Sequence, residues 1–268
     1  MHLANFETAS VADRIARAFV EARRTGDTLA DYPGPVPGAL DEAYAVQDVA
    51  IGLQGEPVGG WKVGRIAAPL VARYGADRLA GPIFAPSIFA ETSAPIAMPV
   101  FGTGFAAAEA EFLLRIGAPP VPGKDDYTLA QAAELIDAVH AGIEIASSPY
   151  PGINADGPAV TASDFGNNNG LVIGAAIADW RDAVLDWPLE LSIDGVVAGR
   201  GRGRDMLDGP VGAAAFLFNL MARRGIALGA GQWISSGAVT GVHPVRPGQL
   251  VEARFAEQLA VRCTIVAV

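Results

Sequence analysis

The chain has 268 residues, of which 51% are hydrophobic and 18% charged, and its formal net charge is −10. Such a chain can bury a large core, so we expect a folded protein and not a disordered one. The acidic balance argues against a nucleic-acid-binding protein and against an anionic membrane surface as partner. Cys263 is the single cysteine, which excludes an internal disulfide and a multi-cysteine metal site. The N-terminus has no basic segment followed by an apolar run, so we expect no signal peptide and a cytoplasmic location.

The N-terminal part of the sequence has helical periodicity. Thr8 and Ser10 are candidate caps, and apolar residues then recur at helical spacing over 11–24. A connector rich in proline and glycine follows, and after it a second helix is predicted over 40–54. We therefore predict a helical N-terminal cap over residues 1–55.

From residue 56 onward, short apolar runs broken by glycine and proline predict strands. Two helices are expected to interrupt them, over 128–140 and 210–223. The strand candidates are Trp61–Val63, Ile96–Val100, Glu109–Ile116, Gly142–Ala146, Leu171–Ala178, Leu189–Ile193, Gln232–Ser236, Leu250–Phe255 and Ala260–Val266. The whole pattern indicates an α+β protein, with a mainly β domain over 56–268 that forms one compact unit with the cap.

Three glutamates lie on predicted apolar strands. Glu109 and Glu111 share one face, because strand side chains alternate, and Glu144 lies between isoleucines in GIEIA. When buried, such a like-charge group is costly unless a cation compensates, and oxygen ligands suit a hard cation such as Mg²⁺. The alternative is a solvated strand face, with Glu144 at a sheet edge or in a salt bridge.

Three further features combine polar groups with glycine or apolar residues. Lys62 in GGWKVG either has a pKa lowered by burial and transfers protons, or extends its ammonium group to solvent. The asparagines of ASDFGNNNGLVIG offer amide donors and acceptors, or form an ordinary polar loop. The turn 235–241, SSGAVTG, binds an anion through backbone N–H groups, or is a plain hairpin turn. His140 is expected to end the helix predicted over 128–140.

The ordered set of segments GGWKVG, AEAEFLLRIG, GIEIASS, ASDF…GLVIG and the run from LDGPVG to SSGAVTG resembles a known family. Over residues 8–266 the chain is similar to the 2-keto-4-pentenoate hydratase and 4-oxalocrotonate decarboxylase family, within the fumarylacetoacetate hydrolase superfamily. The resemblance implies a β-roll catalytic domain with a helical N-terminal region. It also implies Mg²⁺ or Mn²⁺ as cofactor, held by Glu109, Glu111 and Glu144.

The same resemblance implies roles for other residues. Lys62 and Asp164 would be catalytic, and Asn167, Ser236 and Gly237 would bind the substrate. Family substrates are small 2-keto or 2-hydroxy-dienoic acids from aromatic meta-cleavage. The first predicted activity is a lyase that adds water to a 2-hydroxy-2,4-dienoate through a metal-stabilised enolate. The alternatives are decarboxylation of a 2-oxo-dioate, hydrolysis of a C–C bond in an acylpyruvate, and a non-catalytic partner subunit.

This chain departs from the family pattern in the stretch after the WKVG-like segment, in the DN pair, which reads Asp164-Phe165, and in the SGS turn, which reads Ser236-Gly237-Ala238. Family hydratases carry an acid in a PDFG-like stretch after the WKVG-like segment, whereas this chain has Arg78–Gly81, and Asp77 is the nearest acid. The identity of the general acid or base therefore stays open. The expected partners are a homo-oligomeric copy of the chain and another enzyme of the same pathway.

Overall fold

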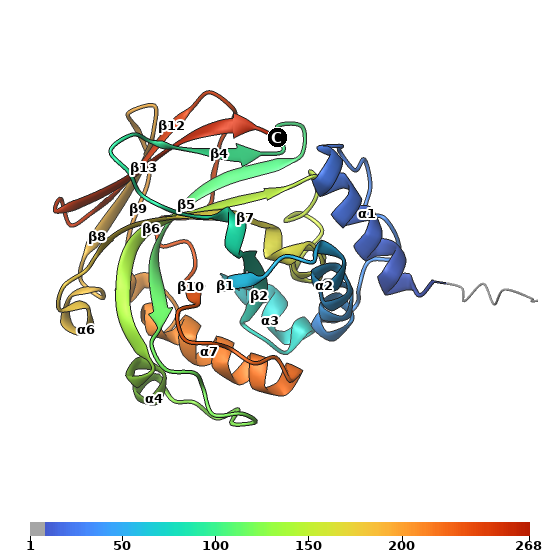
Figure 1. Ribbon diagram of the computed structural model, residues 1–268, viewed down its shortest axis with the longest axis horizontal. Coiled ribbons are helices and arrows are strands. Elements are labelled where there is room, and N and C mark those ends of the chain that lie inside the picture. The colour runs from blue at the N-terminus through green and yellow to red at the C-terminus, as the bar shows by residue number, and fades with distance from the viewer. Residues whose placement is uncertain (1–8) are drawn as a thin grey trace, which may run out of the picture.

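The structure is a computed structural model that describes residues 9–268, and its elements build an α+β fold with two curved sheets (Figure 1). The helices are α1 (Val11–Thr25), α2 (Leu40–Gln54), α3 (Ala68–Tyr74), α4 (Leu129–Glu134), α5 (Pro158–Ser163), α6 (Trp180–Ala183) and α7 (Gly209–Arg224). Short 3₁₀ turns are η1 (Ala85–Ser87), η2 (Phe165–Asn167) and η3 (Gly203–Asp205). Within residues 9–268, every helix is too short or too polar to cross a lipid bilayer.

The larger sheet carries the candidate site. Its strands, in spatial order, are β2 (Arg78–Phe84), β1 (Val58–Arg65), β10 (Trp233–Ser235), β5 (Phe105–Ile116), β6 (Ile136–Ser148), β7 (Asn168–Ala176) and β3 (Ile88–Ala90), with β11 (His243–Pro244) paired to β5. The smaller sheet contains β4 (Ile96–Val100), β13 (Leu259–Ala267), β12 (Leu250–Phe255), β8 (Pro188–Ile193) and β9 (Val196–Arg202). Both sheets are mixed, since β1 pairs with β10 and β13 pairs with β4 in parallel.

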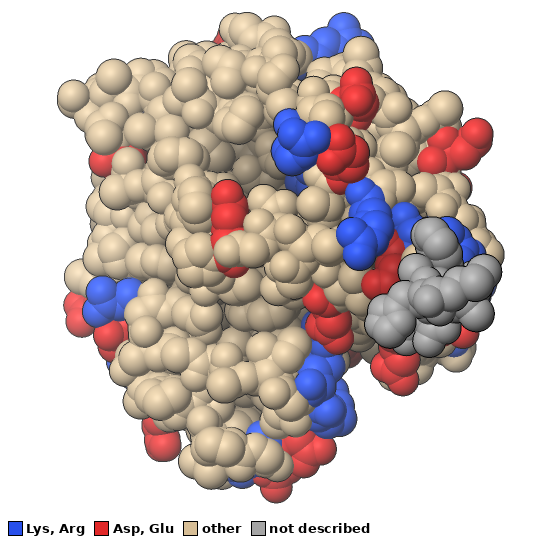
Figure 2. Space-filling model, turned by 45° about the vertical axis from the view of Figure 1, so that its right-hand side comes forward, with Lys and Arg blue, Asp and Glu red and all other residues tan. Residues whose placement is uncertain are grey.

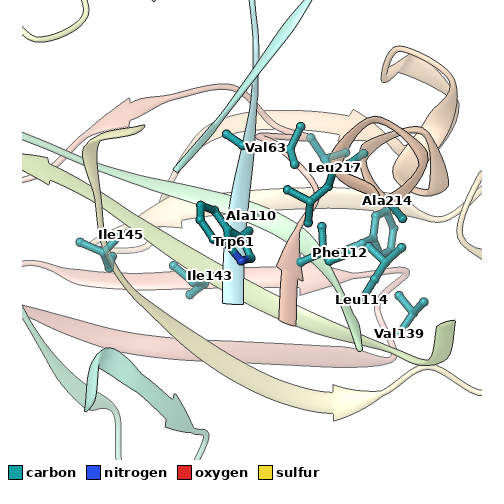
Figure 3. Close-up of a cluster of buried hydrophobic side chains, with 14 of the residues drawn as sticks. Trp61, Val63, Ala110, Phe112, Leu114, Val139, Ile143, Ile145, Ala214 and Leu217 are labelled. Carbon is teal, nitrogen blue, oxygen red and sulfur yellow. The ribbon is translucent and has the colours of Figure 1, made fainter. Parts of the chain in front are cut away.

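The alternation of β5 separates the core from the candidate site. Ala110, Phe112 and Leu114 point into the main hydrophobic core, where they lie with residues of β1, β6 and α7 (Figure 3). Leu113, on the opposite face, belongs to a separate apolar cluster. Because apolar groups cover the strand on both sides, Glu109 and Glu111 on the Leu113 face are buried as well.

The N-terminal helices pack beside the larger sheet (Figure 1). Ser10 caps α1 through a reciprocal capping box with Asp13, and the helix buries Ile15 and Phe19 in a cluster with α2 and α5. Thr8, the other candidate cap, lies outside the described residues. The predicted division into 1–55 and 56–268 stays a prediction.

The prediction of one helix over 128–140 is wrong after Glu134. Helix α4 ends at Glu134, and β6 begins at Ile136, so His140 is a strand residue. Residues 136–140 pair with the end of β5, and Arg115 holds Asp137 across the two strands through bonds of 2.9 and 2.7 Å. The local sequence suits a helix, but pairing with a long neighbouring strand overrides that preference.

The other predicted elements are confirmed, and several short ones were missed. Each predicted strand overlaps a strand of the structure, although Leu171–Ala178 runs two residues past the end of β7 and Gln232–Ser236 exceeds β10 by one residue at each end. The helices over 11–24, 40–54 and 210–223 correspond to α1, α2 and α7. Strand β2 had no signal because RLAGPIF contains glycine and proline, yet it pairs along the whole of β1. Strands β3, β9 and β11 and helices α3, α5 and α6 were not predicted either.

Candidate active site

The pairing of two long strands brings three carboxylates together. Glu109 of β5 lies directly opposite Glu144 of β6, and Glu111 follows two residues along β5 on the same face. One ligand oxygen of each side chain lies within 4.8 Å of those of the other two. Glu109 is 4% exposed, and the other two glutamates are fully buried. The alternatives of a solvated strand face and an edge position for Glu144 are therefore wrong.

In both Glu111 and Glu144, one carboxylate oxygen accepts hydrogen bonds from neighbouring groups and the other oxygen has no partner. Oε2 of Glu111 accepts hydrogen bonds from the Ser235 hydroxyl and from the Gly237 backbone N–H, the latter at 2.9 Å. Oε1 of Glu144 accepts a bond of 2.8 Å from Nδ2 of Asn168. The remaining oxygens, Oε1 of Glu111 and Oε2 of Glu144, are buried without a hydrogen-bond partner.

Lys62 supplies a buried positive charge beside this cluster. It lies on β1 between β2 and β10, and its Nζ is 3.6 Å from Oε1 of Glu144 and 3.3 Å from Oδ1 of Asn167. Its ammonium group does not extend to solvent, since the residue is 5% exposed. Burial by itself would lower the Lys62 pKa, but the three glutamates outweigh it and raise the pKa above its ordinary value. For the metal-free protein the predicted lowering is therefore wrong, because it ignored the neighbouring carboxylates.

The carboxylates carry the electrostatic cost of this arrangement. Burial, opposed by the Lys62 charge, raises the pKa of Glu109 to about 7. Burial, with the like charges of Glu144 and Glu109, raises the pKa of Glu111 well above its usual value. Without a cation, the surroundings thus favour the protonated forms of Glu109 and Glu111.

This donor set fits a divalent cation. Hard cations such as Mg²⁺ and Mn²⁺ take oxygen ligands, and two buried carboxylate oxygens here have no other partner. A cation would also offset the mutual repulsion that raises the pKa of Glu111. The three glutamates together can therefore hold such an ion.

A cavity of about 530 Å³ opens beside the cluster. Its lining includes Lys62, Glu109, Asn167, Ser236 and Gly237, and much of the remaining wall is apolar. Ser236 Oγ is buried and has no hydrogen-bond partner. The structure thus brings together every residue that the resemblance marked for substrate binding.

Two of these residues are already engaged within the protein. The Gly237 N–H donates to Glu111, and Asn167 accepts from Lys62 while its Nδ2 donates to Asn154 at 2.9 Å. The turn 235–241 does hold an anion through its backbone, but that anion is the carboxylate of Glu111. Ser236 is the residue of this group with a free hydroxyl.

Asp164 is not brought to the cavity. Its carboxylate is fully buried and is bound by the Arg23 guanidinium of α1, through Nε at 2.6 Å and Nη2 at 2.9 Å. Asp164 does not line the cavity, so its predicted catalytic role stays a prediction that this geometry does not favour.

Sequence reasoning missed the individual partners of the carboxylates. Asn168 lies within a run of three asparagines and Ser235 within a hydroxyl-rich turn. Both segments are candidates in the sequence, but nothing in them indicates that these two residues donate to Glu144 and Glu111. Arg78 lines the cavity, but its guanidinium is already bound to Asp208 and to the Leu207 carbonyl. Nothing in the sequence pointed to Arg23.

Fold and carboxylate cluster together define an α+β protein of the curled-sheet type with a candidate metal centre. The solved structure of 4-oxalocrotonate decarboxylase from Pseudomonas putida G7, complexed with magnesium and adipate, matches with a TM-score of 0.79 at 21% identity. The match covers 95% of this chain and 97% of that chain. This likeness confirms the predicted fold class.

Curated sequences agree. The 2-keto-4-pentenoate hydratase of Burkholderia vietnamiensis (strain G4 / LMG 22486) is 29% identical over 242 residues, 86% of this chain and 87% of the hydratase. The 4-oxalocrotonate decarboxylase of Pseudomonas sp. (strain CF600) is 29% identical over 128 residues. This match covers 47% of this chain and 48% of the decarboxylase, about half of each protein. No family profile matches the sequence. These similarities confirm the resemblance to the 2-keto-4-pentenoate hydratase and 4-oxalocrotonate decarboxylase family.

Proposed function

We propose that the protein is a divalent-metal-dependent lyase that adds water to a 2-hydroxy-2,4-dienoate and yields a 4-hydroxy-2-oxo acid. The observation that carries this proposal is the buried cluster of Glu109, Glu111 and Glu144 with Lys62 beside a cavity. Similarity to a 2-keto-4-pentenoate hydratase over 86% of the chain supports this reaction class.

Glu109, Glu111 and Glu144 would hold Mg²⁺ or Mn²⁺. The decarboxylase structure complexed with magnesium supports the choice of a hard cation. When bound, the cation supplies Lewis-acid polarisation of the two adjacent oxygens of a 2-oxo acid. Two of these carboxylates are oriented by hydrogen bonds from Ser235, Gly237 and Asn168. Outer hydrogen-bond partners of metal ligands usually have this role.

Lys62 is the residue to which we assign proton transfer. The segment Arg78–Gly81 contributes no carboxylate, and Leu79 lines the cavity there. Lys62 lines the cavity, and its ammonium group holds a proton that can be delivered to the terminal carbon of the dienol. The enol hydroxyl gives up its own proton in the same conversion to the enone and so restores the charge of the lysine. Ser236 Oγ offers a hydrogen bond to an oxygen of the substrate.

Decarboxylation of a 2-oxo-dioate is the second candidate. Arg65 and Arg78 line the same cavity, and either could face a second substrate carboxylate. The similarity to 4-oxalocrotonate decarboxylases supports this reaction. Against it stands the pairing of Arg78, whose guanidinium already contacts Asp77 and Asp208.

The test is turnover of freshly generated 2-hydroxypenta-2,4-dienoate, followed by ultraviolet absorbance and product mass, with Mg²⁺ and with a chelator. Metal-dependent gain of one water is the expected result. Turnover of a 2-oxo-dioate with loss of carbon dioxide, and none of the monoacid, would replace the hydratase by the decarboxylase. Cleavage of an acylpyruvate would indicate the hydrolase. No turnover with any of the three would favour a non-catalytic subunit.

A further inference from the structure

The ion pair between Arg23 and Asp164 connects the N-terminal helix α1 to the turn that follows α5. Its two bonds are bidentate, and the Arg23 and Asp164 side chains are only 10% and 0% exposed. A third bond of 3.0 Å runs from Nη2 of Arg23 to the Ser147 carbonyl on β6. A planar guanidinium held in this way has a fixed orientation, which a single hydrogen bond would not provide.

The turn bound by Arg23, residues 165–167, has an unusual backbone conformation. Phe165, Gly166 and Asn167 have φ angles of 54°, 63° and 59°, so three successive residues are left-handed. For the two that are not glycine this conformation is costly and persists only where the surroundings impose it. Arg23 contacts both sides of the turn, since it binds Asp164 before it and donates to Oδ1 of Asn169 after it at 3.0 Å. Its guanidinium also lies 5.2 Å from the centroid of the Phe165 ring.

The same turn ends on the candidate active site. Asn167 accepts the hydrogen bond from Nζ of Lys62, and Asn168, the next residue, donates to Oε1 of Glu144. Gly166 packs directly on the lysine, because a Cβ at this position would lie 2.9 Å from Cδ of Lys62. A rotation of the turn would therefore move the partners of the lysine and of one carboxylate together.

We propose that Arg23 and Asp164 are positioning residues through which helix α1 fixes the left-handed turn, and with it the orientation of Lys62 and Glu144. The effect on Glu144 rests on the proposed function, because it is expressed as affinity for the cation. The effect on the turn does not rest on it. Asp164 thereby acts through Asn167 and Asn168, without contact to the substrate.

The experiment measures Mn²⁺ affinity by titration, and hydrogen exchange of residues 164–170 in the metal-free protein. We expect Arg23→Gln to weaken Mn²⁺ binding 10- to 100-fold, the range for loss of an outer hydrogen-bond partner, and to speed exchange in the turn. Arg24→Gln is the matched control, because Arg24 is the next residue of α1 and forms an exposed pair with Glu21. It should leave both quantities unchanged.

A double variant separates positioning from stability. Arg23→Gln leaves Asp164 buried and unpaired, which can unfold the protein, whereas Arg23→Met with Asp164→Asn removes both charges of this buried pair. We expect the double variant to fold with near wild-type thermal stability and still to bind Mn²⁺ at least 10-fold more weakly. Wild-type affinity in the folded double variant would overturn the proposal.

The two proposals fail in different ways. If the wild-type protein itself binds no Mn²⁺, the proposed metal function fails, and hydrogen exchange decides about the turn. Exchange in residues 164–170 that is faster in the double variant than in Arg24→Gln supports the anchoring of the turn. Equal exchange in these two variants overturns it.

Discussion

At the scale of single residues, the chemistry of the site depends on buried charges that are not fully compensated. Lys62 is the only cation within reach of three buried glutamates, among the residues that the structure describes, and it contacts Glu144 directly. Burial raises the pKa of Glu109 more than the single charge of Lys62 lowers it, and the like charge of Glu144 adds to the rise.

Replacement of Lys62 separates binding from chemistry. Lys62→Met should lower turnover by roughly 10²- to 10⁴-fold, the range for a positioned proton-transfer group, while Mg²⁺ affinity is kept or rises because a competing positive charge is gone. Steady-state kinetics and calorimetric Mg²⁺ titration measure the two effects. Lys124→Met, at the chain's other lysine, should change neither. A loss of Mg²⁺ affinity in Lys62→Met would show that the lysine instead organises the metal ligands.

At the scale of elements, the site depends on the close approach of β2 to the turn after Asp164. Gly81 faces Lys62 in the pairing of β2 with β1, and a Cβ on Gly81 would lie 2.0 Å from the Phe165 carbonyl oxygen. The glycine is thus required by contact between two backbones, which no local pattern reveals. The pairing of β6 with β5, which corrected the predicted helix, has the same non-local origin.

Gly81→Ala should therefore destabilise the protein. We expect a loss of about 1–3 kcal/mol in the free energy of unfolding, the cost of overpacking a tight contact, measured by urea denaturation. Gly52→Ala is the control, because Gly52 lies in α2 with open space where a Cβ would lie, and alanine there should stabilise by about 0.5–1 kcal/mol. Equal stabilities of the two variants would contradict the close approach.

At the scale of the whole molecule, the fold buries a repulsive charge cluster beside a cavity, on the face of β5 opposite the main hydrophobic core. Figure 2 shows that positive and negative side chains are interleaved on one face, with wide areas between them that carry neither. The surface on this face is therefore mixed in sign, whereas the buried cluster is unbalanced. Assembly into a homo-oligomer, and with another enzyme, stays a prediction.

The unbalanced cluster makes stability depend on pH and metal together. The folded-state pKa of Glu109, about 7, lies above its unfolded value, so folding favours the protonated carboxyl. Without metal, the free energy of unfolding should fall as the pH rises from about 4.5 through 7, and saturating Mg²⁺ should restore it above pH 7. Thermal unfolding at pH 5.5 and 8, with chelator and with Mg²⁺, measures this. Glu109→Gln should make the stability of the metal-free protein less dependent on pH. If the pH dependence of stability is unchanged in this variant, other titrating groups cause it.

The sequence by itself determined the α+β class, the helices over 11–24, 40–54 and 210–223, and the shared face of Glu109 and Glu111. These features depend on local periodicity, which the order of residues contains directly. The apolar strand segments also marked Glu144 and Lys62 as candidate site residues, and the resemblance to a known family implied their roles. Only the tertiary structure decided that β6 replaces a helix, that Gly237 binds Glu111, and that Asp164 faces Arg23. Those outcomes depend on contacts between residues far apart in the chain, and a hydrogen-bond partner chosen by packing has no signature in the local sequence.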